Sequence, residues 1–518
     1  MERGVVRADD TGVKRLAVVG CLAAGLVGAA HAAAAPRFGA AEDATKYAAD
    51  GGASLFVEIR TLGMTENRMV VHWSAADPTH IQEKAFLDRA IPAAQRAGIR
   101  IVFSVYPTDA TGISADIDGR LPLFVAYLQT LARTYPSVTT FIVGNEPNEA
   151  HFWQPQLAPD GTQLSAGLYE RLLAASYDAL KAVSPAITVV GAGPSGDGND
   201  TTSTSPVRFI AALGAAYRAS GRAAPLMDQL AFHVYPGTNT DSPSKPRDWP
   251  NIGPSDLDRL EQAVWDAFAG TAQPTFPEGP AAPGSGLSLM VDEFGWQAAV
   301  QPGQAGYYGV ENVPTVSEDE QAAFYASLIG QLSCNPVVSD AMVFHLVDEA
   351  DLARFQSGLL RADRSQRPAF GAVRDAIAAA GSCATPHLWS HAAGVIGADA
   401  TFPSGNVAAR QALFGVSATA AEDALGTAGI FRLRSGAERV PSEELSRALA
   451  SSHAARAPVR TVSKAVKAGW TPRFEFRGRL KPGWYVYAIR LQAQMNPNRA
   501  ETLVSARFRV GRASKRPT

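Results

Sequence analysis

The chain has 518 residues, of which 46% are hydrophobic, and it carries a formal net charge of -2. A chain of this length and apolar content can bury a large core and still supply residues for a second domain. A net charge so close to zero gives no electrostatic reason to expect nucleic acid or an anionic membrane as a partner, so neutral ligands are favoured.

The first 34 residues are expected to be a signal peptide. Lys14 and Arg15 precede an apolar run over 16–30, and Ala30-His31-Ala32 has the small residues that a signal peptidase accepts. The run is shorter than the about 20 residues that a membrane span needs, so a retained anchor is the less favoured alternative. We therefore expect a secreted, extracellular protein without an integral span in the mature chain, and with association to the cell surface as a variant of that location.

From residue 36 onward, apolar runs of strand length alternate with longer segments of helical periodicity, a pattern that predicts βα units and a parallel sheet. The expected strands lie near 37–39, 68–73, 99–106, 139–146, 188–191, 230–236, 287–296 and 341–346. The expected helices lie near 55–62, 81–97, 122–135, 168–183, 207–220, 255–268, 318–332 and up to 380. Gly98 suits a helix C-cap, and Ser317 with Glu320 forms a capping box. Eight repeats predict a (β/α)8 TIM barrel over residues 36–383, whose functional groups lie at the carboxyl ends of the strands.

Two of these strands end in a carboxylate. The apolar run 139–143 is followed by Asn145-Glu146-Pro147, and the proline both ends the strand and keeps Glu146 out of helical geometry. The run 287–296 has the same pattern and carries Glu293. Two carboxylates at one barrel mouth are what acid/base and nucleophilic catalysis on a glycosidic bond require.

Asn145-Glu146-Pro147 together with Glu293 resembles the paired glutamates of glycoside hydrolase clan A, particularly families 5 and 39, over about residues 36–380. The resemblance implies a retaining glycoside hydrolase that acts on an oligo- or polysaccharide without metal or cofactor. Glu146 would be the acid/base and Glu293 the nucleophile. Two strand-end glutamates that merely face solvent are the structural alternative.

The same resemblance implies roles for four further polar residues. Asn145 would bind the sugar 2-hydroxyl, and Arg68 would lie against the nucleophile. His233 and Tyr235 match a His-x-Tyr pattern, with Tyr235 donating to the nucleophile. An Asx turn, a surface arginine and core aromatic residues are the respective alternatives.

Aromatic residues near the strand ends offer faces on which sugar rings stack, with core packing as the alternative. They are Trp73, Tyr106, Trp153 and Trp296. Many members of the clan place a tryptophan at the end of strand eight, whereas this chain has Phe344 and His345, followed by Asp348 and Glu349. The choice between a pyranose and a furanose therefore stays open, as do the linkage and exo or endo action. A non-catalytic glycan-binding barrel and a transglycosylase are the alternative functions.

The last part of the chain, 384–518, loses the βα alternation. Alternating segments at 431–433, 472–477, 483–491 and 506–510 predict a small all-β, sandwich-like domain. It is expected to be a structural companion of the barrel, and a glycan-binding exposed face is the alternative. Cys334 and Cys383, the pair left after removal of the signal, are expected to form a disulfide, with two separate buried thiols as the alternative. A monomer is expected.

Overall fold

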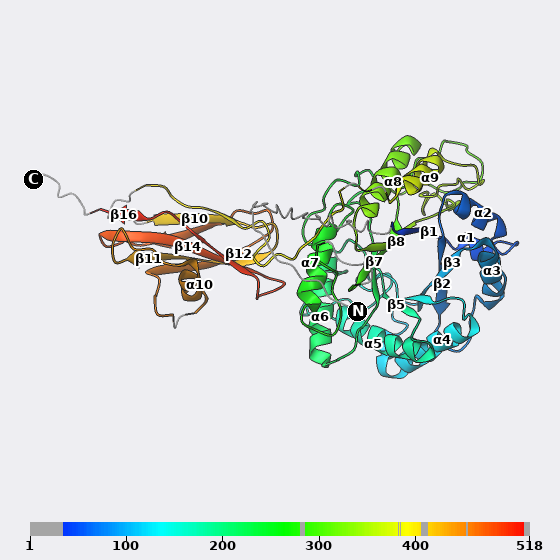
Figure 1. Ribbon diagram of the computed structural model, residues 1–518, viewed down its shortest axis with the longest axis horizontal. Helices are drawn as coiled ribbons and strands as arrows, with labels where there is room; N and C mark the ends of the chain where they lie inside the picture. The colour runs from blue at the N-terminus through cyan, green and yellow to red at the C-terminus, as the bar shows by residue number, and fades with distance from the viewer. Residues whose placement is uncertain are drawn as a thin grey trace, which may run out of the picture. The chain divides into compact units, whose positions relative to one another are not determined.

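The computed structural model describes residues 35–279, 285–381, 383, 385–405, 413–451 and 454–511, so the expected signal peptide lies outside the described residues. Eight parallel strands close into a barrel in sequence order, with helices around them (Figure 1). The strands are β1 Arg37–Ala41, β2 Glu66–Trp73, β3 Arg100–Pro107, β4 Thr140–Val143, β5 Thr188–Gly191, β6 Gln229–His233, β7 Ser288–Phe294 and β8 Val338–Val343. The predicted (β/α)8 barrel is confirmed.

The helices follow the strands as expected. They are α1 Ala44–Tyr47, α2 Ala53–Thr61, α3 Lys84–Ala97, the 3-10 turn η1 Ser114–Asp116, α4 Ile117–Thr134, α5 Ser165–Val183, α6 Pro206–Ser220, α7 Leu257–Phe268, α8 Glu318–Ser333 and α9 Pro368–Ala379. Gly98 closes α3 in the left-handed region, and the Ser317–Glu320 capping box opens α8. The predicted start of α4 at Pro122 is wrong. Asp116 caps the helix by accepting from Gly119 N, so the helix begins before Pro122, which lies inside it.

The barrel has an inner and an outer apolar layer, because alternate residues of a buried parallel strand point to opposite faces. The inner layer comprises Val102, Ile142, Val190, Ala231, Met290 and Met342. Their neighbours, such as Phe103 and Phe141, belong to the larger core between strands and helices. The filled interior closes the barrel below its mouth, where the polar residues at the strand ends lie.

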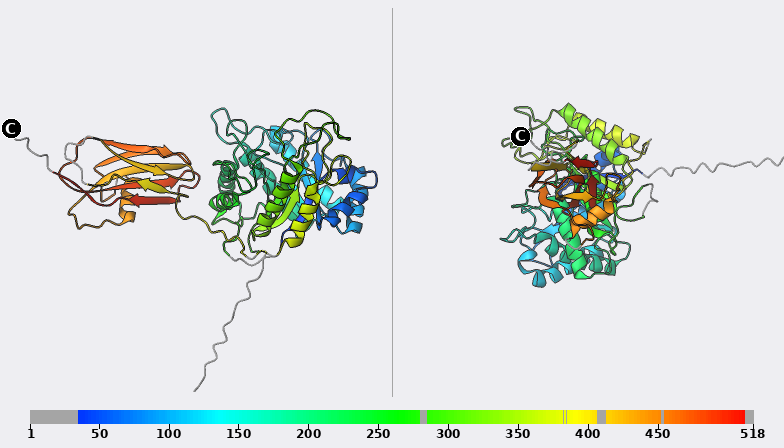
Figure 2. Two further views of the ribbon diagram at one scale, coloured as in Figure 1. Left: turned by 90° about the horizontal axis from the view of Figure 1, so that it is seen from above. Right: turned by 90° about the vertical axis from the view of Figure 1, so that its left-hand side faces the viewer.

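The C-terminal part forms two antiparallel sheets, so the predicted all-β domain is also confirmed. Its elements are β9 Asp399–Thr401, β10 Leu413–Thr419, β11 Ala424–Leu433, α10 Ser442–Ala450, β12 Arg460–Val466, β13 Arg473–Arg477, β14 Gly483–Ala493, β15 Ala500–Val504 and β16 Phe508–Val510. One sheet has the order β13-β10-β9 and the other β12-β11-β14-β15, with β16 also paired to β14. The strands of this domain lie side by side and are aligned with one axis, with neighbouring strands running in opposite directions (Figure 2).

The five-stranded sheet of this domain is covered on both faces. Ile430 and Tyr487 face the first core, which Phe476 of the other sheet also joins. Phe431, the residue after Ile430, faces a second core with Leu445 of α10. Because successive residues face two different apolar cores, the sequence around them has the pattern typical of a β-strand.

Cys334 and Cys383 form the predicted disulfide, with their Cα atoms 5.4 Å apart. It links the C-cap of α8 to the segment that follows α9. Within the described residues, none of the helices has the length and apolar character needed to cross a membrane.

Candidate active site

A cavity of about 790 Å³ lies at the carboxyl ends of the barrel strands. Every strand, or the loop that follows it, contributes to its lining. Glu146 and Glu293 both line it, as do Arg68, Asn145 and Tyr235. His233 lies next to these residues but is completely buried. The polar residues predicted from the sequence therefore gather in one place.

Glu146 lies on a turn beyond β4 rather than on the strand itself. β4 ends at Val143, and Gly144 follows with φ +93°. Glu146 has φ +35°, a left-handed conformation that a non-glycine residue adopts at a cost of about 1–3 kcal/mol and that concentrates at functional sites. Its amide nitrogen donates to the Gly193 carbonyl oxygen at 3.1 Å, which fixes the turn against the loop after β5. The predicted strand reached Glu146, three residues too far, because Pro147 was taken as the residue that ends it. The chain in fact turns away earlier, at Gly144.

Glu293 reaches the cavity through a bulge in β7. Ala231 pairs with Met290 and His233 pairs with Glu293, so two steps along β6 match three along β7. The same mismatch recurs against β8. An inserted residue changes the side on which the following residues point. As a result Asp292 and Glu293, which regular alternation would separate, both contact the same polar groups.

His233 joins the two glutamates. Its Nδ1 lies 2.7 Å from Glu146 Oε1 and 3.4 Å from Glu293 Oε2. The two oxygens are therefore at most about 6 Å apart, the sum of these distances. Burial alone would lower the pKa of His233, but the negative charges of Glu293 and Asp292 outweigh it and raise that pKa well above its ordinary value. The ring thus lies among three carboxyl groups.

Arg68 is a cation of the site, and it is buried. Its Nη1 donates to Glu293 Oε1 at 2.8 Å and its Nη2 to Asn145 Oδ1 at 2.8 Å. Its Nε lies 3.2 Å from Asp292 Oδ2. One guanidinium therefore orients the carboxylate of Glu293 on β7 and the amide of Asn145 after β4.

Tyr235 donates from its hydroxyl to Glu293 Oε2 at 3.0 Å. Burial, followed by the charge of Glu293, raises the pKa of Tyr235 well above its ordinary value, so it acts as a hydrogen-bond donor. Both oxygens of Glu293 are thus engaged, Oε1 by Arg68 and Oε2 by Tyr235.

Asp292 belongs to this cluster although the sequence did not single it out. It is completely buried, and its Oδ2 lies 3.5 Å from His233 Nε2 as well as near Arg68. Burial by itself raises the pKa of Asp292, but the charges of His233 and Arg68 bring it below its ordinary value. The sequence shows that Asp292 precedes Glu293, but regular strand alternation would place their side chains on opposite faces of β7. Only the bulge explains why both contact Arg68 and His233.

The wall formed after β8 contains Phe344, His345, Glu349, Arg354 and Phe355. Glu42, buried after β1, accepts from the amide nitrogens of residues 346 and 347 at 3.0 and 2.9 Å and so holds the start of this loop. Burial raises the pKa of Glu42.

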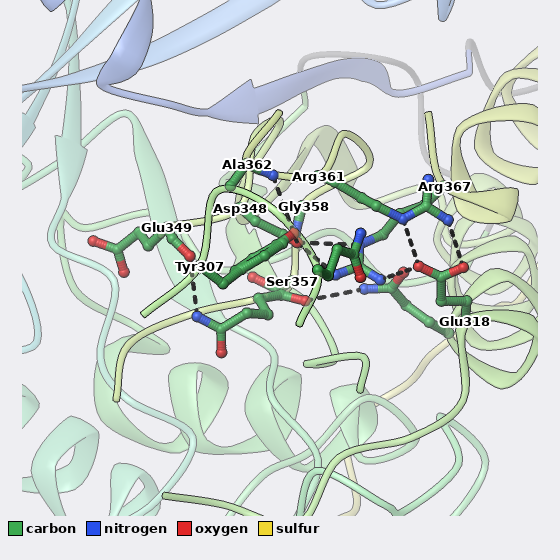
Figure 3. A network of polar contacts seen from close by, with 12 residues as sticks. Tyr307, Glu318, Asp348, Glu349, Ser357, Gly358, Arg361, Ala362 and Arg367 are labelled. Carbon is green, nitrogen blue, oxygen red and sulfur yellow. Dashed lines mark hydrogen bonds and ion pairs between the residues drawn. The ribbon is translucent and has the colours of Figure 1, made fainter. Parts of the chain in front are cut away.

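Asp348 lies behind this wall and faces away from the cavity. As Figure 3 shows, it accepts from Tyr307 Oη and Arg367 Nη2, each at 2.5 Å, and from Gly358 N at 2.7 Å. Arg367 also donates to Glu318 at the start of α8. Asp348 is therefore a buried anchor of the loop, while its neighbour Glu349 lines the cavity.

Three of the four aromatic residues predicted to stack on sugar lie in the core. Trp73, Trp153 and Trp296 are buried and absent from the cavity lining. Trp73 Nε1 donates to Pro78 O, and Trp296 Nε1 donates to Asp241 O. Tyr106 does line the cavity, together with His151, Phe152, Phe344 and Phe355. The sequence shows that an aromatic residue is near a strand end, but one step of register decides whether it faces the mouth or the helices.

Among the residues that the structure describes, no group of three or more His, Cys, Asp or Glu side chains is arranged to hold a metal ion. The polar groups at the mouth instead neutralise one another as ion pairs between Arg68, His233 and their carboxylate neighbours.

No protein-family model matches the sequence, and no curated protein sequence matches it either. The structure is similar to that of a family 39 glycoside hydrolase from the gut symbiont Bacteroides cellulosilyticus WH2, with 16% identity, 79% of this chain and 74% of that chain covered, and a TM-score of 0.45. It is also similar to a GH5_18 protein from Streptomyces cattleya solved with GlcNAc, with 18% identity, coverages of 68% and 83%, and a TM-score of 0.46. A monomeric beta-xylosidase from Caulobacter crescentus CB15 has 17% identity, coverages of 89% and 98%, and a TM-score of 0.43. At these identities and TM-scores the likeness decides neither the activity nor the site residues of this chain.

Proposed function

We propose that the protein is a glycoside hydrolase that cleaves O-glycosidic bonds with retention of configuration. The observation that carries the proposal is the contact of Glu146 and Glu293 with one nitrogen of His233, at 2.7 and 3.4 Å. The two contacting oxygens are at most about 6 Å apart, so the two carboxyl groups face each other at close range, as the 5–5.5 Å separation in retaining enzymes requires.

Glu293 is the proposed nucleophile. The guanidinium of Arg68 at 2.8 Å and the hydroxyl of Tyr235 at 3.0 Å both donate to it, and these are contacts that a carboxylate accepts. One oxygen of Glu293 attacks the anomeric carbon while the bond to the leaving oxygen breaks. The product of this step is a glycosyl ester of Glu293.

Glu146 is the proposed acid/base. In the first step it gives its proton to the leaving oxygen, and in the second it takes a proton from the water that cleaves the ester. Its contact with Nδ1 of the buried His233, at 2.7 Å, fixes the position of this carboxyl group next to Glu293. Both carboxyl groups return to their first protonation state after one turnover.

Asn145 is the proposed ligand of the sugar hydroxyl beside the anomeric carbon. Arg68 holds its Oδ1 at 2.8 Å, and no partner for its Nδ2 occurs within the described part of the chain. The amide N–H groups are thus left for a sugar oxygen. A cavity of about 790 Å³ lies within the range of ligand sites and suits an oligosaccharide end.

We also propose that the protein acts outside the cytosol. The Cys334–Cys383 disulfide supports this location, because such bonds persist in oxidising compartments.

The test replaces each glutamate separately. E146Q and E293Q should each lower kcat on an aryl glycoside by at least about a thousandfold, with Tm unchanged, because each removes a group that acts on the reacting bond. E349Q is the matched control, since Glu349 lines the same cavity but pairs with Arg354 at 3.7 Å, and it should keep most of the activity.

A fluoroglycoside that traps the covalent intermediate should add its glycosyl mass to a peptide that contains Glu293. Full activity of either Gln variant, or labelling of a different carboxylate, would refute these roles. A glycan-binding barrel without catalysis would gain no mass, and a transglycosylase would make longer products when an acceptor sugar is present.

A further inference from the structure

The segment 456–481 of the C-terminal domain is strongly basic. It contains eight cationic residues and a single carboxylate, Glu475. The cationic residues are Arg456, Arg460, Lys464, Lys467, Arg473, Arg477, Arg479 and Lys481. The whole chain has a net charge of -2, so this concentration of positive charge is local.

Four of these cations form a continuous surface, which we call the basic strip: Arg460 and Lys464 of β12, and Arg473 and Arg477 of β13. All four are exposed. Lys464 Nζ donates to the Arg473 carbonyl oxygen at 2.7 Å, and Arg460 Nε donates to the Arg477 carbonyl oxygen at 3.4 Å. The side chains of β12 thus reach both ends of β13.

The strip lies where the two sheets of the domain meet at an edge. β12 is the end strand of one sheet and β13 the end strand of the other. In β13 the exposed residues alternate with Phe474 and Phe476, which are buried in the core. The strip is therefore held on a rigid framework, with Arg473 and Arg477 projecting outward about 13 Å apart, four strand residues at about 3.3 Å each.

The charges of the strip are largely uncompensated within the described residues. Its closest carboxylate contact is between Arg473 and Glu475, at 3.8 Å and with both side chains exposed. Other cations of the segment are paired: Arg456 contacts Glu438 and Glu444, and Lys467 contacts an aspartate at 2.9 Å. Cations on an edge strand also prevent sheets from joining edge to edge, which is the purely structural explanation.

Protection of the sheet edge does not explain why Trp470 is exposed. It lies in the turn between β12 and β13 and is 73% exposed, more than any other aromatic side chain among the described residues. An exposed tryptophan contributes nothing to edge protection, but it offers a flat face for the apolar side of a sugar ring.

We propose that the basic strip and Trp470 bind an acidic polysaccharide that carries carboxylates, and that this polymer is an anchor rather than the substrate. Guanidinium groups pair with carboxylates through two parallel hydrogen bonds, and a row of them about 13 Å long fits a polymer better than a single sugar. A single exposed aromatic residue favours a glycan over a single-stranded nucleic acid, which needs a platform for successive bases.

The negative charge at the barrel mouth indicates that the polymer bound by the basic strip is not the substrate. The cavity is lined by Asp43, Glu149, Asp197 and Glu349 in addition to the two proposed catalytic glutamates. Its cations, Arg68 and Arg354, are already paired with carboxylates. A polyuronate would be repelled there, whereas the basic strip attracts it.

The experiment measures binding of the full-length chain to polygalacturonate by affinity electrophoresis, at low and at physiological salt. R473Q/R477Q should weaken binding at least tenfold and reduce its salt dependence, because two charges are removed. W470A should weaken binding about tenfold without changing the salt dependence, because a stacking contact carries no charge. R439Q/R447Q is the matched control, since it removes two exposed arginines near α10 in the same domain, and it should bind as the wild type does.

Hydrolysis of a neutral aryl glycoside should be unchanged in all three variants, so the result does not depend on the proposed catalytic roles. Equal losses in the arginine control would show that binding follows net charge and would overturn the proposal. Wild-type affinity in R473Q/R477Q would overturn it as well, and so would tighter binding of single-stranded DNA than of polygalacturonate.

Discussion

Glu149 lies one turn along the chain from Glu146. Its amide nitrogen donates to the Glu146 carbonyl oxygen at 2.8 Å, and both side chains line the cavity. Burial, followed by the charges of Glu146 and Asp197, raises the pKa of Glu149 to about 7. Asp197 is itself paired with Arg247 at 2.8 Å. Glu149 therefore changes its charge close to neutral pH, beside the proposed acid/base and without a cation of its own among the described residues.

This position predicts an effect of E149Q on the pH profile of kcat/KM. Glu149 gains its charge near pH 7, so it places a negative charge beside the reacting groups only above that pH. E149Q carries no charge at this position at any pH, so the change in kcat/KM that the wild type shows around pH 7 should become smaller in this variant. E349Q is the control and should keep the wild-type profile, and coincident profiles for E149Q and the wild type would contradict the prediction.

At the scale of the elements, the sequence predicted all eight barrel strands, because apolar runs of strand length stand between helical segments with clear caps. The polar residues at the strand ends followed from the same pattern. The bulge in β7 and the turn that carries Glu146 could not be predicted, because both arise from backbone conformations that no residue type announces. For that reason the contacts of Asp292 were missed.

Glu261 of α7 is a titratable residue outside the proposed active site, and it is completely buried. Asn335, after α8, donates to its Oε1 at 3.1 Å, and its Oε2 has no hydrogen-bond partner among the described residues. Burial raises the pKa of Glu261 to about 7, and the hydrogen bond from Asn335 offsets only part of that effect. The carboxyl group is thus neutral in the folded protein over a pH range in which it is charged in the unfolded chain.

The sign of the resulting pH dependence follows from proton binding. Between about pH 4.5 and pH 7 the folded state holds a proton that the unfolded state has lost, so the free energy of unfolding falls as pH rises. The contribution is fully present below pH 4.5 and is lost by pH 7, with an upper limit of ~3 kcal/mol. E261Q stays neutral at every pH and should make this fall smaller in urea unfolding experiments, whereas the contributions of other buried carboxyl groups such as Glu66 remain. E443Q, on the exposed side of α10, should retain it, and an unchanged fall in E261Q would refute the assignment.

At the scale of the whole molecule, the barrel and the C-terminal domain have separate apolar cores. Phe103 belongs to the barrel core, and Phe476 belongs to the core between the two antiparallel sheets. The sequence predicted the strands around Phe431, Phe476 and Tyr487 from their alternation. It did not predict β9 and β10, because the small residues around them give little contrast between the two faces of a strand.

Separate cores predict separate unfolding. Phe103 and Phe476 are buried to the same degree, with at most 1% of either side chain exposed, so F103A and F476A each remove one aromatic ring at a cost of about 3–5 kcal/mol. F476A should lower the calorimetric transition of the C-terminal domain by about 10 °C or more, at roughly 4 °C per kcal/mol for a domain of this size. Because the proposed catalytic residues all lie in the barrel, the temperature at which aryl glycosidase activity is lost should not change. F103A should do the reverse. If the two variants instead lower one common transition, and activity is lost with it in both, the C-terminal domain is the structural companion that its sequence suggested, and its core stabilises the barrel on which catalysis depends.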